Sequence, residues 1–224
     1  MEILFITDLH ENPNTISFIE DYIKNNTGVV IIGGDVDSIS LTEQLVSLMN
    51  RTDRMVMVLG NHDYPINMKD RGILHGSTTV IDGYTIGGLG GSLPCFGPFE
   101  VSESEYALLC ENMGPVDILV SHNPPYHTAC DILTGTIENG YHIGSKAISN
   151  YIRNTQPLVA FSGHIHESAG KSYIGDTLCL NPGAFIEGCY AKVNIVDKKV
   201  VGELKRNIKL EPEKLPQFYK EKDF

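Results

Sequence analysis

Basic residues are scarce in this chain. Its 224 residues include 17 lysines and arginines against 28 aspartates and glutamates, which gives a formal net charge of −11. This balance argues against non-specific binding of nucleic acid through a basic surface. It leaves a phosphate-bearing small molecule open, because bound divalent cations would add positive charge at one point.

Long apolar runs are missing as well. No run approaches the length of a membrane span, and the first apolar run has no basic segment before it of the kind that opens a secretory signal. We therefore expect no membrane partner and a cytoplasmic location. The chain also lacks a Gly/Ser-rich linker, a repeat and a low-complexity tract, which predicts a single domain over residues 1–224. Within it, the Lys-, Glu- and Pro-rich stretch 211–224 is expected to be a solvated C-terminal tail, and a homo-oligomer is left open.

Cysteine pairs at metal-binding spacing are absent. The five cysteines are scattered, and no CxxC occurs. An odd number of dispersed cysteines is typical of small buried residues in a reducing compartment, and it disfavours a disulfide framework or a thiolate metal site.

Five short apolar runs are present, and each leads into residues of metal-binding type. The runs cover residues 2–7, 29–32, 55–59, 118–121 and 158–162. The residues that follow them are Asp8 and His10, Asp35, Asn61 with His62 and Asp63, His122, and His164 with His166. Such runs are typical of buried strands, and ligands of open α/β sheets bind outside the carboxyl ends of the strands. We therefore expect the five strand ends to meet at one metal centre.

The spacing of the remaining apolar residues predicts the rest of the fold. Helical spacing over 14–26, with Asn12 or Asn14 as cap, and over 41–49, with Ser40 as cap, alternates with the first strands and indicates βαβ units. Two further helices are expected after Ser102 and Ser145. Short runs at 79–81, 84–89, 172–174, 177–180, 190–196 and 199–204 are expected to form hairpins of a second sheet, with turns at 82–83 and 197–198. The predicted fold is α/β (α+β), a four-layer α-β-β-α sandwich of two mixed sheets flanked by helices.

The number of candidate ligands indicates two metal ions. The set has nitrogen and oxygen donors and no thiolate, and it comprises Asp8, His10, Asp35, Asn61, His122, His164 and His166. A catalytic zinc uses about three protein ligands and a water, so this set is too large for one ion. Two ions roughly 3.5–4 Å apart that share a carboxylate are the arrangement of phosphatases and nucleases.

The motifs Asp8-x-His10, Gly34-Asp35, Gly60-Asn61-His62, His122 and Gly163-His164-x-His166 follow one another in this order. In this they resemble the calcineurin-like metallophosphoesterase superfamily. Segments such as 87–92, 121–126, 142–146 and 181–183 are similar to those of the small Icc-related predicted phosphoesterases of archaea and bacteria. The resemblance covers roughly residues 1–203.

This resemblance implies a role for each motif residue. Asp8, His10, Asp35 and His166 would hold the first metal, and Asp35 would bridge to a second metal held by Asn61, His122 and His164. His62 would face the substrate phosphate as general acid or as charge stabiliser, and Asp63 would orient its imidazole. The cofactors would be two divalent ions, with manganese as the first choice and iron, zinc or nickel as alternatives.

Substrate contacts are expected from the loops. Tyr126 and His127 follow His122 and are placed to reach a substrate, and Ser145 could hold a phosphate at a helix start or serve as a plain helix cap. Glu11 stands where the family often has glycine, which would narrow the phosphate entrance. The sequence thus predicts a dinuclear-metal-dependent phosphoesterase that hydrolyses a small phosphodiester or nucleotide-type substrate by metal-activated hydroxide. The alternatives are a metal-dependent nuclease and a non-catalytic binding scaffold on the same fold.

Overall fold

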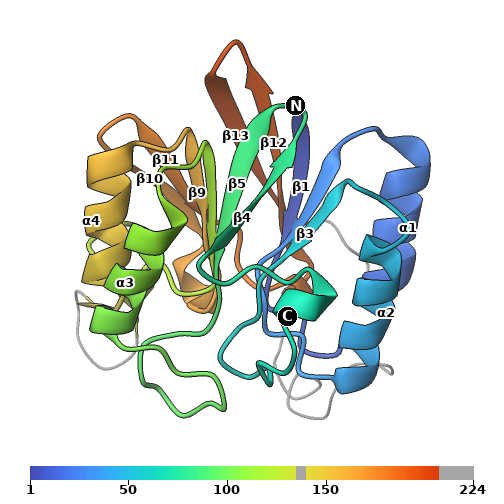
Figure 1. Ribbon diagram of the computed structural model, residues 1–224, viewed down its shortest axis with the longest axis horizontal. Helices are drawn as coiled ribbons and strands as arrows, with labels where there is room; N and C mark the ends of the chain where they lie inside the picture. Colours follow the sequence, from blue (N-terminus) through green and yellow to red (C-terminus); the bar gives the residue numbers. More distant parts are fainter. Residues whose placement is uncertain (135–139, 207–224) are drawn as a thin grey trace.

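Two β-sheets lie face to face, and each is covered on its outer side by a pair of helices (Figure 1). The computed structural model describes residues 1–134 and 140–206. The arrangement confirms the predicted four-layer α-β-β-α sandwich. The stretch 211–224, predicted to be a solvated tail, lies outside the described residues.

The first sheet has the strand order β13-β12-β1-β2-β3. Its strands are β1 (Glu2–Ile6), β2 (Val29–Ile32), β3 (Met55–Met57), β12 (Cys189–Val196) and β13 (Lys199–Arg206). The pairs β1–β2 and β2–β3 are parallel, as the predicted βαβ units require, and β12 runs antiparallel to both β1 and β13.

The second sheet has the strand order β10-β11-β9-β6-β5-β4. Its strands are β4 (Ser77–Ile81), β5 (Tyr84–Leu89), β6 (Ile118–Ser121), β9 (Val159–Phe161), β10 (Gly170–Ile174) and β11 (Thr177–Asn181). The four central strands are mutually parallel, and antiparallel strands close both edges. The pairing therefore makes this sheet mixed, like the first.

Alternating side chains of the strands fill two different layers of core. In β1, Ile3 and Phe5 pack between the sheets, while Leu4 and Ile6 pack under the helices. The Phe5 ring meets the ring of Phe161 from the second sheet at a centroid distance of 4.7 Å. Both faces of the central strands are apolar because each face has a partner layer, which is why these strands appear in the sequence as continuous apolar runs.

Four helices form the outer layers. They are α1 (Thr15–Asn25) and α2 (Ile39–Met49) on the first sheet, and α3 (Glu103–Met113) and α4 (Lys146–Thr155) on the second (Figure 1). Short elements complete the fold: strands β7 (Ile132–Leu133) and β8 (Tyr141–His142), and the 3₁₀ turns η1 (Lys69–Arg71), η2 (His166–Ser168) and η3 (Phe185–Glu187). Among the described residues, none of the helices has the length and apolar character needed to cross a membrane.

The helix caps agree with the sequence in part. Ser102 forms the expected capping box with Glu105, and the Ser145 side chain caps α4. The prediction of Ser40 as cap of α2 is wrong: α2 begins at Ile39, and the side chain of Ser38 accepts from the backbone N–H of Leu41. At α1 the N-cap is Asn14, whose side chain makes no capping bond.

The last hairpin lies in a different sheet from the one predicted. Residues 190–196 and 199–204 belong to β12 and β13, which extend the first sheet beside β1. The local sequence pattern indicates a hairpin, but it does not specify which edge of which sheet the hairpin extends. The burial of Ala191, Val193 and Ile195 between the sheets favours this edge. The turn itself is as expected, since Asp197 and Lys198 both have positive φ, as a type I′ turn requires.

Candidate metal centre

The ends of the five predicted strands converge, and the two sheets contribute different ligands. Asp8, His10, Asp35 and Asn61 follow strands of the first sheet, while His122, His164 and His166 follow strands of the second. Six of these side chains form two clusters, in each of which one donor atom per residue lies within 4.8 Å of the others. The clusters are Asp8 with His10 and His166, and Asp35 with His122 and His164.

The first cluster turns imidazole nitrogens toward one another. Nε2 of His10 lies 3.1 Å from Nε2 of His166, which itself lies 3.4 Å from Oδ1 of Asp8. The other ring nitrogen of His10, Nδ1, is 2.6 Å from the Asp37 carboxylate. A carboxylate at Nδ1 fixes the ring and leaves Nε2 as the donor atom, which is the usual support for a metal-binding histidine. Asp37 is not among the site residues predicted from the sequence, where its only signal is its position two residues after Asp35.

In the second cluster, the ring of His122 is fully buried. Nε2 of His122 lies 3.4 Å from Oδ1 of Asp35 and 3.1 Å from Oδ1 of Asn61. Nδ1 of His122 is 2.8 Å from the backbone carbonyl of Gly33, to which it can donate its proton. The ring is therefore oriented by the backbone, with Nε2 facing the two oxygen donors.

Backbone strain is concentrated at this centre. Asp8, His10, Asp35 and His164 all have φ between +43° and +69°. Left-handed backbone is costly for non-glycine residues and persists where the surrounding structure imposes it, often at functional sites. Gly60 has a steric reason for its identity, because a Cβ there would collide with the Asp35 carboxylate.

Charges within the centre are strongly coupled. Burial opposes ionisation of Asp35, but the charge and hydrogen bond of His122 prevail and hold the pKa of Asp35 well below its usual range. Burial likewise lowers the pKa of His122, yet the charge and hydrogen bond of Asp35 raise it to about 9. For His10, burial is outweighed mainly by the hydrogen bond to Asp37, and the pKa is raised. For His164, burial and the charge of His122 lower the pKa to about 4.

These features fit two divalent cations. Each cluster combines a buried carboxylate with two imidazoles, a donor set suited to Mn, Fe, Zn or Ni. The anchored Nδ1 atoms of His10 and His122 leave Nε2 facing each cluster. The carboxylates around these two histidines raise both pKa values, so a cation bound at either Nε2 would compete with a proton there.

Metal binding is therefore expected to release protons. His122, with its pKa near 9, is protonated in the metal-free protein at pH 7.5 and must lose that proton to bind a cation. For each proton that a cation displaces, the apparent affinity for the metal rises about tenfold with each unit of increasing pH, up to that pKa. The raised pKa of His122 also adds to the free energy of unfolding of the metal-free protein. This contribution is fully present below pH 6.5 and is lost as the pH rises through about 9.

Calorimetric titration of Mn²⁺ or Zn²⁺ in two buffers of different ionisation enthalpy counts the released protons. We expect at least about one proton at pH 7.5, and fewer in His122→Ala, in which the first cluster is still present. A pH-independent affinity with no proton release would contradict the assignment of His122 as a ligand.

A sequence model described as calcineurin-like phosphoesterase matches residues 1–168 of the 224. The chain belongs to the calcineurin-like phosphoesterase family. This confirms the resemblance based on the strand-end motifs, and all seven motif ligands lie within the matched residues.

One relative in sequence and two solved structures are similar to this chain. An uncharacterized protein of Methanocaldococcus jannaschii, MJ1162, is 31% identical over 205 residues, covering 81% of this chain and 88% of its own. The crystal structure of TT1561 of Thermus thermophilus is similar with a TM-score of 0.64 at 17% identity, over 90% of this chain and 97% of its own. GAP50, described as the anchor in the inner membrane complex of Plasmodium, has a TM-score of 0.52 at 12% identity, over 91% and 84% of the two chains.

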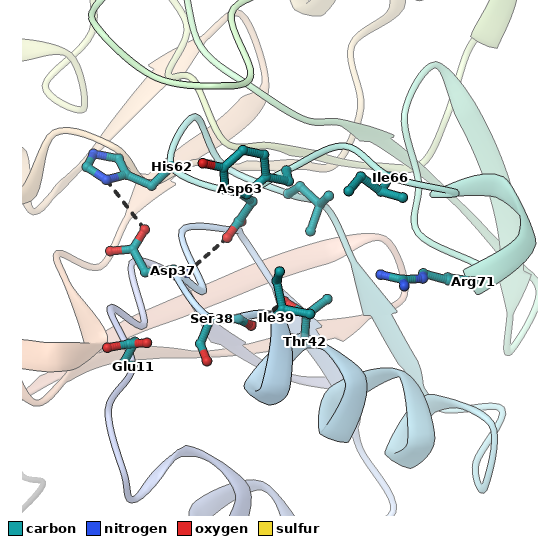
Figure 2. Close-up of a pocket in the computed structure, with 11 residues that line it drawn as sticks. Glu11, Asp37, Ser38, Ile39, Thr42, His62, Asp63, Ile66 and Arg71 are labelled. Atoms are coloured by element: carbon teal, nitrogen blue, oxygen red, sulfur yellow. Dashed lines mark hydrogen bonds and ion pairs between the residues drawn. The ribbon is translucent and has the colours of Figure 1, made fainter.

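His62 lies beside the candidate metal ligands, but its partner is not the one expected. Its side chain is 51% exposed, and Nδ1 lies 3.4 Å from the Asp37 carboxylate (Figure 2). Asp63 instead accepts from the backbone N–H groups of Gly60, Val36 and Asp37. Burial, together with the charge of Asp35, raises the pKa of Asp63 to about 6. The prediction that Asp63 orients His62 is therefore corrected: Asp37 pairs with the imidazole, and Asp63 ties the loops together.

Ser145 is also placed differently from its proposed role. Its hydroxyl is buried, accepts from Ile148 N–H and donates to the Glu103 carboxylate at 2.8 Å. Glu103 also accepts from the backbone N–H groups of Lys146 and Ala147. The carboxylate of Glu103 thus already occupies the anion-binding start of α4, and of the two alternatives for Ser145 the structure favours the cap.

Tyr126 and His127 lie in a cluster of rings. His127 packs on His142 at a centroid distance of 4.5 Å, and Tyr126 lies 5.9 Å from each of these rings. The buried Asp131 holds the group, accepting from the backbone N–H of His127 and lying 2.8 Å from Nδ1 of His142. Their contact with a substrate stays a prediction.

The cysteines mostly follow expectation. All five are free thiols, and four of them are buried. The exception is the half-buried Cys95, whose Sγ lies 3.8 Å from Nε2 of His164 and 2.9 Å from Oγ of Ser92. This contact could not be predicted from the sequence, because Cys95 and His164 are 69 residues apart in the chain.

Proposed function

We propose that this protein is a phosphoesterase that uses two divalent cations to hydrolyse a small phosphodiester or a nucleotide-type ester. The observation that carries the proposal is the pair of adjoining Asp/His clusters with the half-exposed His62 beside them. Membership of the calcineurin-like phosphoesterase family supports the reaction class.

The side chains divide into three roles in this proposal. Asp8, His10 and His166 would hold one cation, Asn61, His122 and His164 would hold the other, and Asp35 would serve both. Cations bound there would activate the attacking water and offset the charge that develops on the transferring phosphoryl group. His62 gives a proton to the leaving oxygen or stabilises its charge, and Asp37 holds the imidazole at Nδ1 so that Nε2 is left for the substrate.

Two other functions follow from the same fold. A nuclease would use the same chemistry, but the formal charge of −11 opposes attraction of a polyanion. A binding scaffold is the other alternative, and GAP50, described as an anchor, is similar to this chain in fold alone. This chain has a residue of ligand type at each of the seven motif positions and a histidine at position 62, and this supports catalysis.

The proposal is tested with metal-free protein loaded separately with Mn, Ni, Fe or Zn. Bis(p-nitrophenyl) phosphate and p-nitrophenyl phosphate are supplied as diester and monoester, alongside single-stranded and duplex DNA. We expect saturable, metal-dependent turnover of the diester and no digestion of DNA. Bound metal without turnover of any ester would establish a scaffold, and cleavage of DNA would establish a nuclease.

A further inference from the structure

A pocket of about 320 Å³ lies beside His62, and its lining includes none of the seven candidate metal ligands. It lies between the start of α2, the loop that carries Tyr64 and Ile66, and Arg71. Figure 2 shows His62 and Asp37 at one end of the lining and Arg71 at the other, with Ile39 and Ile66 between them. His62, which could protonate a leaving oxygen, therefore lies at one end of this pocket.

The pocket has exposed apolar walls. Ile39, Tyr64 and Ile66 are 67%, 62% and 54% exposed, although all three line a concavity. Covering large apolar side chains is favourable in proportion to the area removed from water. Two branched aliphatic side chains and an aromatic ring suit a flat, apolar group of the size of a benzene ring or a nucleobase.

The charges of the pocket are unfavourable to a second phosphate. Glu11 and Asp37 both line it at the His62 end, and Asp37 pairs with the His62 imidazole (Figure 2). The guanidinium of Arg71, at the other end, is already paired with Glu43 at a distance of 2.5 Å. An additional anion on the bound group would therefore meet two carboxylates close to His62 and a cation whose charge is already compensated.

We infer that this pocket binds the leaving group of the substrate, and that this group is aromatic or otherwise flat and apolar, carries no second phosphate, and is neutral or cationic. The inference rests on the proposed function, because it needs His62 at the leaving oxygen. In the step, water adds to phosphorus, the bond from phosphorus to the leaving oxygen breaks, and that oxygen takes a proton and departs as an alcohol. Ile39, Tyr64 and Ile66 are specificity-determining residues in this account.

The choice of leaving group gives the sharpest test. Benzyl methyl phosphate can release either benzyl alcohol or methanol, and phosphorus NMR distinguishes the methyl phosphate and benzyl phosphate that remain. We expect benzyl alcohol to leave. In the Ile39→Ser, Ile66→Ser double variant, kcat/KM for this ester should fall by about 10-fold, while that for ethyl methyl phosphate changes by less than about twofold.

The matched control is Val80→Ser, because Val80 is 65% exposed on β4 and is not among the lining residues. Thermal unfolding checks that the variants fold. Release of methanol, or equal losses on both esters, would overturn the pocket assignment while leaving phosphoester hydrolysis intact.

Binding measurements separate failure of the pocket from failure of the proposed function. If no ester is turned over, metal-loaded protein is titrated calorimetrically with benzylphosphonate and methylphosphonate. We expect benzylphosphonate to bind at least about 10-fold more tightly than methylphosphonate. A second phosphonate at the para position of its ring should remove this difference in affinity. The loss caused by the second phosphonate should be larger in the native chain than in Glu11→Gln. Equal affinity for benzyl- and methylphosphonate would refute the pocket whatever the catalytic result.

Discussion

Replacing Asp35 with asparagine is expected to empty both metal positions and to abolish hydrolysis. Oδ1 of Asp35 lies 3.4 Å from Nε2 of His122 and accepts the backbone N–H of His62 at 3.0 Å. An amide of the same size fits beneath Gly60 but removes the negative charge that two neighbouring cations would share. Changing a residue that only orients a ligand costs about 10–100-fold in metal affinity, so we expect loss of a shared ligand to cost more than about 100-fold.

Metal content after dialysis, measured by mass spectrometry, checks this result together with the rate on bis(p-nitrophenyl) phosphate. Asp82→Asn serves as the control, since Asp82 lies in the exposed turn between β4 and β5 and makes its ion pair with Arg54. Circular dichroism confirms that both variants fold. Two ions at full occupancy in Asp35→Asn would refute the shared carboxylate.

Replacing His62 with alanine should have the opposite profile, with both metals retained and turnover lost. The His62 side chain is half exposed and pairs with Asp37, and it belongs to neither ligand cluster. Proton transfer by a positioned side chain contributes about 10²–10⁴-fold to rate, and we expect a loss in that range.

The leaving group distinguishes the two roles that remain open for His62. An alkoxide needs a proton to depart, whereas p-nitrophenolate is stable without one. A general acid therefore predicts a larger loss on alkyl esters than on p-nitrophenyl esters, and a charge stabiliser predicts similar losses on both. Metal analysis of His62→Ala accompanies the rates. Full activity in the metal-loaded variant would exclude both roles.

The parts of this molecule that sequence could predict depend on local signals. Each candidate metal ligand lies within a few residues of the end of a buried apolar run, so His122 and His164 could be placed at strand ends without knowledge of the other strands. The Ser102 capping box is likewise complete within four residues.

The parts that were missed depend on partners distant in sequence. The choice of Asp37 over Asp63 as partner of His62 depends on how two loops meet, as the bond from Asp37 N–H to Asp63, 26 residues later, shows. The Ser145 hydroxyl is occupied because Glu103, 42 residues earlier, reaches it. Ile39 and Ile66 lie 27 positions apart in the sequence, and only the fold brings them into the lining of one pocket.

The division of ligands between the two sheets has a mechanical consequence. Nε2 of His10 and Nε2 of His166 are separated by 156 positions in the chain, yet they lie 3.1 Å apart. A cation held by both would act as a cross-link that closes a very long loop, and such closures restrict the unfolded chain most strongly when the loop is long. Chelation would then do more than stop a reaction. It would remove a link between the two sheets of the sandwich, so that metal supply would set how long the folded protein persists.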